Sequence, residues 1–230
     1  MRLTPEQQWL FRLAGFVRLP DRLPPETVRE MREAIEDDIA AAREPLVRNA
    51  AGRIVRLSDA LDRAPIFRQV ATSPLVLDPL EDLLGPNIEL LRNRHNHLTL
   101  RLPDRRAEAL HRDVPQWTRG LVTVLFFLEE STCEKGCTQL VPGSHLLPWA
   151  ATPAEVIERG RLQDQVVRAE APEGGLLAID SLLWHGVGPN KTEQTRATMT
   201  MGYHSVDDLA TTEEPQCLLA RGGRPYAGNR

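Results

Sequence analysis

The apolar run Leu121–Leu128 limits most strongly what this chain can fold into. It contains two valines and two phenylalanines and no charged residue. Short runs of β-branched and aromatic residues without charges are typical of strands that are buried on both faces. We therefore predict that this run is a central strand of a sheet and that other parts of the chain cover it.

Several further strand-like segments follow residue 88, and turns such as Gly174-Gly175 and Gly188-Pro189-Asn190 separate them. Besides the central run, the predicted strands are Ile88–Leu102, Gly136–Val141, Val166–Ala169, Leu176–Ile179, Trp184–Val187 and Arg196–His204. Many short strands with glycine and proline turns predict a sandwich or a barrel. The best match is an all-β core with flanking helices (α+β), built as a double-stranded β-helix of the jelly-roll or cupin type.

Helix signals precede these strands. Thr4 can cap a helix that starts at Pro5, Gln7 completes a capping box, and Gly15 follows the expected end. Further predicted elements are a short strand at Phe16–Leu19 and helices that run from Pro24-Pro25 to Ala42 and from Ser73-Pro74 to Leu84.

Two segments carry weaker signals. Prolines and a glycine interrupt residues 44–74, so we expect an irregular segment with one short helix near Ser58–Arg63. The polar, glycine-rich tail after Asp207 is also expected to be irregular.

Composition limits the class of protein. At 230 residues the chain fits one domain, 1–230, in which helices in residues 1–85 pack on a jelly-roll core in residues 86–206. The net charge of -4 and the scattered arginines argue against a nucleic-acid partner, and no apolar run reaches the ~20 residues that span a membrane. Three cysteines without a disulfide framework predict a cytoplasmic protein. We expect a small-molecule substrate and a monomer or homodimer.

His111-Arg112-Asp113 places an imidazole and a carboxylate two residues apart. On an extended backbone these side chains point to the same face, so both can bind one metal ion. His185 lies on a later predicted strand. Two histidines and one carboxylate with open coordination positions describe the metal site of non-haem Fe(II) oxygenases, because three positions stay free for a bidentate cosubstrate and O₂.

Arg196 follows His185 by eleven residues, and its guanidinium could hold a carboxylate through two parallel hydrogen bonds. Alternation along the strand puts Arg196, Thr198 and Thr200 on one face. If Arg196 points into the barrel, the two threonines therefore line it as well.

These motifs together resemble the phytanoyl-CoA dioxygenase family of Fe(II)/2-oxoglutarate oxygenases, which have a jelly-roll core. The resemblance rests on His111-Arg112-Asp113, Gly136, Pro142-Gly143-Ser144-His145, His185, Asn190 and Arg196, in that order. It implies that His111, Asp113 and His185 bind iron. It also implies that Arg196 pairs with the C5 carboxylate of 2-oxoglutarate.

The resemblance suggests further site residues. Trp117 corresponds to an aromatic residue near the iron in many members. Some members have a small hydroxyl residue where this chain has Val187, so we expect the second hydrogen bond to the cosubstrate from Thr198. An amide upstream of the His-x-Asp motif often holds the C1 carboxylate, and Asn96 or Asn93 could serve.

The implied enzyme is a 2-oxoglutarate-dependent non-haem iron dioxygenase (hydroxylase) that uses Fe(II), 2-oxoglutarate and O₂. Its substrate would be a small metabolite with an unactivated C–H bond, such as a natural-product intermediate. Asp113 favours hydroxylation over halogenation, since related halogenases have a small residue at this ligand position. Desaturation, cyclisation, epimerisation and a non-oxygenase, cupin-like metal-binding protein stay open as alternatives.

The substrate region is less defined. Arg92, Arg94, His95 and His97 form a polar cluster that could bind an anionic head group or be an ordinary ion-paired strand. We expect a substrate lid from residues 44–74, 103–110 and 148–165, the last containing a helix at Ala151–Gly160.

Overall fold

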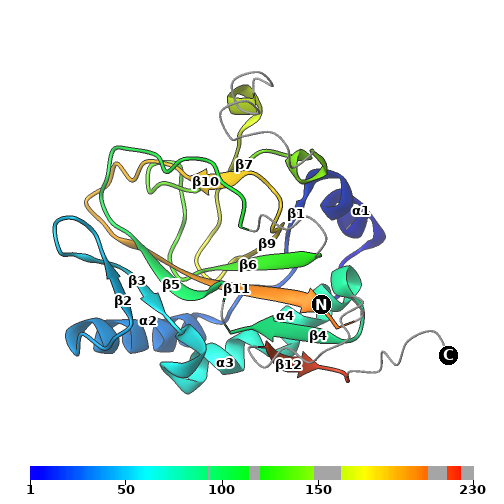
Figure 1. Ribbon diagram of the computed structural model, residues 1–230, viewed down its shortest axis with the longest axis horizontal. Helices are drawn as coiled ribbons and strands as arrows, with labels where there is room; N and C mark the ends of the chain where they lie inside the picture. Colours follow the sequence, from blue (N-terminus) through cyan, green and yellow to red (C-terminus); the bar gives the residue numbers. More distant parts are fainter. Residues whose placement is uncertain (93, 114–119, 148–161, 207–216, 224–230) are drawn as a thin grey trace.

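The computed structural model describes the chain except residues 93, 114–119, 148–161, 207–216 and 224–230. Two antiparallel sheets pack together, and helices cover the outer face of the larger one (Figure 1). The helices are α1 (Pro5–Ala14), α2 (Pro25–Ala40), α3 (Pro65–Ala71) and α4 (Pro74–Leu84). The strands are β1 (Phe16–Arg18), β2 (Leu46–Arg48), β3 (Ile54–Ser58), β4 (Ile88–Leu91), β5 (Asn96–Arg101), β6 (Leu121–Phe127), β7 (Thr138–Leu140), β8 (Val167–Ala169), β9 (Leu176–Asp180), β10 (His185–Val187), β11 (Arg196–Ser205) and β12 (Cys217–Arg221).

The larger sheet has the strand order β1-β9-β6-β11-β5-β3-β2, and β4 joins β11 to β12. The smaller sheet has the order β10-β7-β8. Strand β6 lies between β9 and β11, and all its residues except Leu125 are buried. The central position predicted for this run is therefore confirmed, as is the jelly-roll class with flanking helices.

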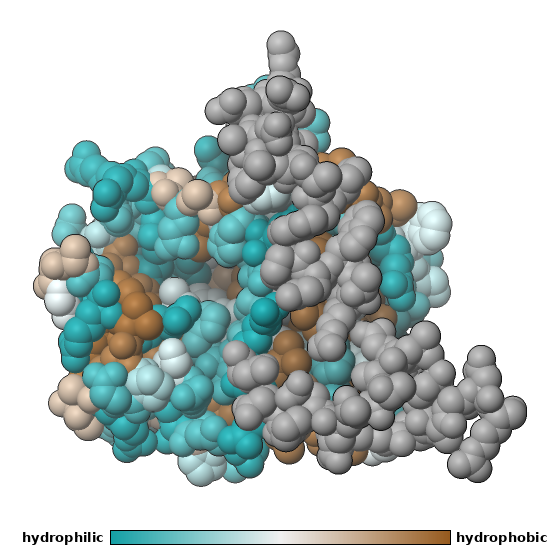
Figure 2. Space-filling model, in the orientation of Figure 1, coloured by the Kyte–Doolittle hydropathy of each residue, from teal (hydrophilic) through white to brown (hydrophobic). Residues whose placement is uncertain are grey.

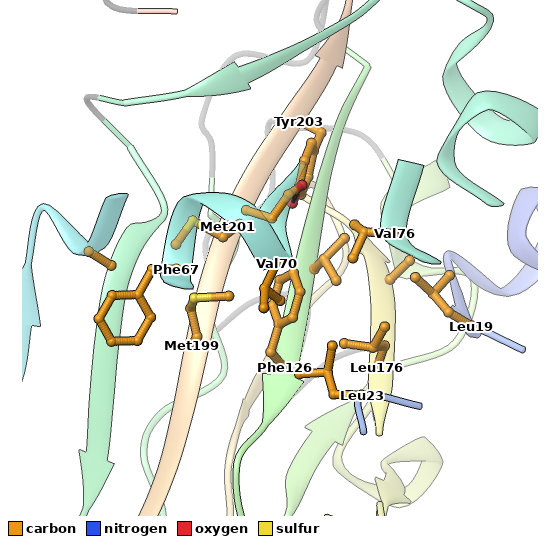
Figure 3. Packing of buried hydrophobic residues seen from close by; sticks show 14 of the residues in the cluster. Leu19, Leu23, Phe67, Val70, Val76, Phe126, Leu176, Met199, Met201 and Tyr203 are labelled. Atoms are coloured by element: carbon orange, nitrogen blue, oxygen red, sulfur yellow. Dashed lines mark hydrogen bonds between the residues drawn. The ribbon is translucent and has the colours of Figure 1, made fainter. Parts of the chain in front are cut away.

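The helices bury one face of the larger sheet. Side chains from α2, α3 and α4 form a continuous core with alternate residues of β11. Figure 3 shows Phe67 and Val70 of α3 beside Met199 and Met201. Tyr203 is fully buried and donates a hydrogen bond of 2.9 Å from its hydroxyl to the carbonyl of Ala71. The predicted alternation of β11 is thus correct, with one face in the core and the other free for a site.

The first helix follows its sequence signals closely. Thr4 Oγ1 accepts a hydrogen bond from Gln7 N, and the Gln7 side chain accepts one from Thr4 N, which is the expected capping box. Gly15 ends the helix in a left-handed conformation with φ of +83°.

In residues 44–74 the short helix expected near Ser58–Arg63 is confirmed, but the irregular structure expected for the rest of the segment was wrong. The segment holds the β2–β3 hairpin and α3, as well as a 3₁₀ turn at Ala60–Asp62. Arg63 holds this segment together. Its buried guanidinium forms a 2.9 Å ion pair with Asp38 of α2 and donates hydrogen bonds to three backbone carbonyls. A buried cation requires such partners, and this one fixes the hairpin against the helix.

Two strand boundaries also differ from expectation. Ile88–Leu102 is interrupted between Leu91 and Asn96, where His95 adopts a positive φ of +49°. The tail forms β12, which pairs with β4. The sheet also takes β1, β2 and β3 from the first 85 residues, so its strands extend beyond the 86–206 range expected for the core.

The surface in Figure 2 is mainly hydrophilic, with scattered hydrophobic patches. Within the described ranges, no helix has the length and apolar character needed to cross a membrane. The expected helix at Ala151–Gly160 lies outside the described residues.

Candidate metal centre

His111 and His185 lie directly opposite each other on two antiparallel segments. His111 N is 2.7 Å from His185 O, and His185 N is 2.9 Å from His111 O. Opposed residues point to the same face, and the centroids of the two imidazole rings are 4.5 Å apart. The backbone pairing therefore brings together two histidines that are 74 residues apart in the sequence.

Asp113 completes the cluster. Its backbone N–H donates to Ser181 O at 3.0 Å, which fixes the chain two residues after His111. Its Oδ1 atom lies 3.4 Å from His185 Nε2 and 3.9 Å from His111 Nε2. The ligand atoms of all three residues lie within 4.8 Å of one another. The structure thus brings together the predicted pair of histidines and the predicted carboxylate.

Both imidazoles are oriented by backbone carbonyls. His185 Nδ1 is 2.8 Å from Leu183 O, and His111 Nδ1 is 3.3 Å from Ala109 O. A carbonyl can only accept, so each Nδ1 carries the proton. In the neutral imidazoles the lone pair is then on Nε2, the nitrogen on the side of Asp113, where it can bind a metal ion that lies between the three residues.

The electrostatics of Asp113 also suit a cation. Burial acts to raise the pKa of its carboxyl, but contacts with His185, His95 and the Thr123 hydroxyl outweigh burial and hold the pKa well below its usual range. Thr123 Oγ1 donates to Asp113 Oδ2 at 2.8 Å. Burial conversely acts to lower the pKa of His185, and the Asp113 carboxylate raises it overall. The charged carboxylate and two nitrogen donors fit a divalent metal such as ferrous iron.

The Pro142-Gly143-Ser144-His145 turn supports the strand that carries His185. Ser144 Oγ accepts a 2.8 Å hydrogen bond from Trp184 N. Arg112 donates to Ser144 O at 2.8 Å, and its guanidinium lies 5.1 Å from the Trp184 ring. Arg112 therefore points away from the metal cluster, as alternation predicts.

The cluster opens into a cavity of about 600 Å³, which Arg196, Thr198 and Thr200 also line. Arg196 is buried and donates to Thr198 Oγ1 at 2.7 Å and to Gly136 O at 2.9 Å. Burial and the nearby Arg101 lower its pKa to about 10. The guanidinium therefore stays charged at neutral pH and is available to a carboxylate in the cavity.

Gly136 allows the loop to reach this arginine. Its φ is +72°, and a Cβ atom there would lie 2.5 Å from Gly188 O. Only glycine fits this position without movement of the backbone. This close approach brings the Gly136 carbonyl within hydrogen-bond distance of the Arg196 guanidinium.

Asn96 is not brought into the cavity. Its amide accepts from Leu61 N at 2.9 Å and donates to Arg92 O at 3.0 Å, so both of its polar atoms serve local structure. Its neighbours His95 and His97 line the cavity instead. Trp117 and Asn93 lie outside the described residues.

In the sequence, His95 and His97 were recognised only as part of a polar cluster. His97 stands opposite Thr200 in the β5–β11 ladder. Opposed residues share a face of the sheet, so a cavity-facing Thr200 implies that His97 faces the cavity too. His95 Nδ1 lies 3.9 Å from Asp113 Oδ1. Burial lowers the pKa of both imidazoles, that of His97 to about 4 with a contribution from Arg56. Arg92 does not line the cavity and instead forms an ion pair of 2.8 Å with Asp62.

A jelly roll with two histidines and one carboxylate at its cavity is typical of non-haem iron oxygenases. The family model for phytanoyl-CoA dioxygenase (PhyH) matches residues 11–198, and the chain belongs to this family.

Curated relatives include dioxygenase af480 of Aspergillus fumigatus, which is 29% identical over 150 residues and matches 62% of this chain and 46% of that protein. Dioxygenase trt7 of Aspergillus terreus is 28% identical over 204 residues, which are 81% of this chain and 68% of that protein. The match thus spans about half the length of the first relative and about two thirds of the second.

Solved structures share the fold. EctD from S. alaskensis with 2-oxoglutarate and 5-hydroxyectoine has a TM-score of 0.76 at 20% identity, with coverage of 90% of this chain and 77% of that chain. The non-heme alpha ketoglutarate dependent epimerase SnoN from nogalamycin biosynthesis has a TM-score of 0.75 at 21% identity, with coverage of 97% and 98%.

Proposed function

We propose that this protein is an Fe(II)- and 2-oxoglutarate-dependent dioxygenase that hydroxylates an unactivated C–H bond of a small metabolite. One observation carries the proposal: the ligand atoms of His111, Asp113 and His185 converge at a cavity that also contains the buried, charged Arg196. Membership of the dioxygenase family and the iron and 2-oxoglutarate named for similar structures support it.

His111, Asp113 and His185 would hold iron on one side. Three octahedral positions would then be free for the keto acid and O₂. Bound iron supplies the oxidising chemistry, and the protein supplies ligands, orientation and exclusion of side reactions. The carbonyls of Ala109 and Leu183 keep both imidazoles in the required tautomer.

Arg196 would bind the C5 carboxylate of 2-oxoglutarate, with the Thr198 hydroxyl beside it at 2.7 Å. We assign the C1 carboxylate to His95 in place of Asn96. His95 lies next to Asp113, and its Nε2 atom is buried with no hydrogen-bond partner among the described residues. A bound carboxylate would satisfy this nitrogen in the tautomer that carries its proton on Nε2.

The charges that line the cavity favour an anionic substrate. Iron, Asp113, 2-oxoglutarate and Arg196 together have a net charge of about zero at neutral pH. Arg101 is already paired with Glu108 at 2.9 Å. Arg53 and Arg56 from the β2–β3 hairpin also line the cavity, and neither has an ion-pair partner in the described part of the chain.

The strand register directs Arg56 to the cavity. Arg56 stands opposite Thr99, which stands opposite Thr198 in the next strand pair. Opposed residues share a face, so Arg56 emerges on the same side as the proposed cosubstrate site. We infer that the substrate has a carboxylate, phosphate or sulfate group, which the hairpin would hold.

The outcome of the oxidation depends on which C–H bond the cavity presents. The named epimerase among the similar structures keeps epimerisation, with desaturation and cyclisation, as an alternative outcome on the same cofactors. The second candidate is a cupin-like metal-binding protein without oxygenase activity.

Succinate formation tests the proposal and separates these classes. Purified protein with Fe(II), ascorbate, O₂ and 2-oxoglutarate should release succinate slowly without any other substrate. A control reaction without iron should release none. Succinate at background level in the complete reaction would favour the non-oxygenase alternative. A screen of small anionic metabolites for stimulated succinate release should then identify the substrate.

A further inference from the structure

A second group of metal-binding side chains lies outside the proposed active site. It consists of Glu89 on β4, His204 on β11 and Cys217 on β12. None of the three lines the 600 Å³ cavity or takes part in the proposed chemistry.

The strand register brings the three side chains to one face. Glu89 stands opposite His204 in the β4–β11 ladder and opposite Leu219 in the β4–β12 ladder. Cys217 is two residues before Leu219, and residues two apart on a strand point to the same face. Three adjacent strands thus direct a carboxylate, an imidazole and a thiol to one point.

The distances suit a shared ion. His204 Nε2 lies 3.7 Å from Cys217 Sγ and 2.8 Å from Glu89 Oε2. Zinc bonds of about 2.3 Å to sulfur and 2.0–2.1 Å to nitrogen, at a tetrahedral angle, imply a sulfur–nitrogen separation of roughly 3.6 Å. The carboxylate would have to move by only about 0.5 Å to make room for the ion.

The surroundings are largely buried. Glu89 is 4% exposed and His204 is 9% exposed, whereas Cys217 is half-buried and gives access. Leu91 stands opposite Cys217, and Leu121 stands opposite His204. Apolar side chains around a metal site limit the access of solvent to it.

We propose that Glu89, His204 and Cys217 form a second metal site, which binds Zn²⁺ with a water molecule in the fourth position. The thiol distinguishes it from the His111–Asp113–His185 cluster, which has only nitrogen and oxygen donors suited to ferrous iron. Binding releases the thiol proton, requires His204 Nε2 to give up the proton that it donates to Glu89, and replaces the Glu89–His204 hydrogen bond with two metal bonds.

The ion would fasten one end of β12. In the described structure this strand pairs only with β4. Its other end is already tied to α4, because Arg221 forms ion pairs with Asp78 at 2.7 Å and Glu81 at 2.9 Å. A metal at Cys217 would link β12 to β11 as well and would stabilise the attachment of this strand to the sheet.

Cobalt substitution gives a direct test, because a thiolate bound to Co²⁺ produces a near-ultraviolet charge-transfer band. Full-length protein titrated with Co²⁺ should show the band, and Cys217→Ala should lose it. Cys133→Ala is the matched control and should keep it, as should Asp113→Ala, whose site contains no sulfur. Absence of the band in the wild type, or its persistence in Cys217→Ala, would overturn the proposal.

Melting with the natural ion provides the second measurement. Zinc should raise the melting temperature of the wild type relative to chelator, since an ion that binds only the folded state stabilises it. Glu89→Gln and Cys217→Ser should reduce this shift, and Cys217→Ser replaces Cys217→Ala if the alanine variant does not fold. Equal melting with zinc and chelator in the wild type would show that Glu89 and His204 form an ion pair only.

Discussion

The cavity-facing side of β11 has two ends that differ in access and in chemistry. At one end Arg196, Thr198 and Thr200 face an open cavity that contains the His111–Asp113–His185 cluster. At the other end His204 is enclosed near Leu121 and Cys217. Each cluster offers three protein ligands, but of the two only the first lies at the 600 Å³ cavity. The comparison teaches that the space beside the ligands, as much as the ligands themselves, decides whether a cluster can also accept a cosubstrate.

Gly202 marks the boundary between the two ends. It lies between Thr200 and His204 on the same face of β11. A Cβ atom at this position would be 3.0 Å from Leu91 Cδ1 and 3.2 Å from His95 Cβ. The missing side chain therefore lets a leucine of the closed end and a histidine of the open end approach the same strand.

Among variants that test this comparison, Asp113→Ala should have the largest effect on iron affinity and activity. Loss of an outer partner of a metal ligand costs about 10- to 100-fold, so loss of the ligand itself should cost more than about 100-fold in iron affinity. Succinate formation should be abolished, as measured by iron titration and product analysis. Asp21→Ala, which removes an exposed carboxylate from an ion pair with the N-terminus, is the control. Full activity in Asp113→Ala would remove this residue from the ligand set.

Arg196→Leu should have the next largest effect. Loss of one partner of a hydrogen-bonded charge pair costs about 2–5 kcal/mol, which is roughly 30-fold or more in affinity. The 2-oxoglutarate concentration needed for half-maximal succinate release should rise accordingly, with a much smaller change in iron affinity. An unchanged requirement would point to a different cosubstrate anchor at the open end.

Arg56→Gln tests the charge of the open end. A partly exposed ion pair contributes up to about 1 kcal/mol, so stimulation by an anionic substrate should require about fivefold more of it. Arg48→Gln is the matched control, because Arg48 lies on the same hairpin but donates to Gly52 O and does not line the cavity. Equal responses of the two variants would argue against the anion site.

The last expected effect concerns the pH dependence of stability and leaves activity aside. Burial first, and Arg56 next, lower the pKa of His97 to about 4 from its usual 6.5. Between these values the unfolded chain binds more protons than the folded one, so His97 makes the free energy of unfolding fall as the pH drops from about 6.5 to 4. His97→Gln should flatten this fall in denaturant titrations at several pH values. Parallel curves for wild type and variant would contradict the neutral state of His97 at the open end.

Much of the open end could be predicted from the sequence. The period of two along Arg196–Tyr203 correctly separated cavity-facing from core-facing side chains. The apolar run at residues 121–128 correctly indicated the central strand. These signals are local, because burial on a strand leaves a pattern in consecutive residues.

The remaining features depend on contacts that are distant in sequence. The strands of the β2–β3 hairpin are only three and five residues long, and Arg63 fixes the hairpin through a buried partner on α2. The face of Asn96 could not be assigned, because the break before β5 resets the alternation of the expected strand. β12 gives a weak signal alone and becomes a strand through its pairing with β4.

The most direct test of the central claim is an anaerobic titration of the ferrous protein with 2-oxoglutarate, followed by visible absorption. Binding of the keto acid to iron held by His111, Asp113 and His185 should produce a new absorption band in the wild type. Asp113→Ala should give no band at the same iron and 2-oxoglutarate concentrations. A ferrous wild-type protein that shows no band at saturating 2-oxoglutarate, or an Asp113→Ala variant that shows the full band, would contradict the account.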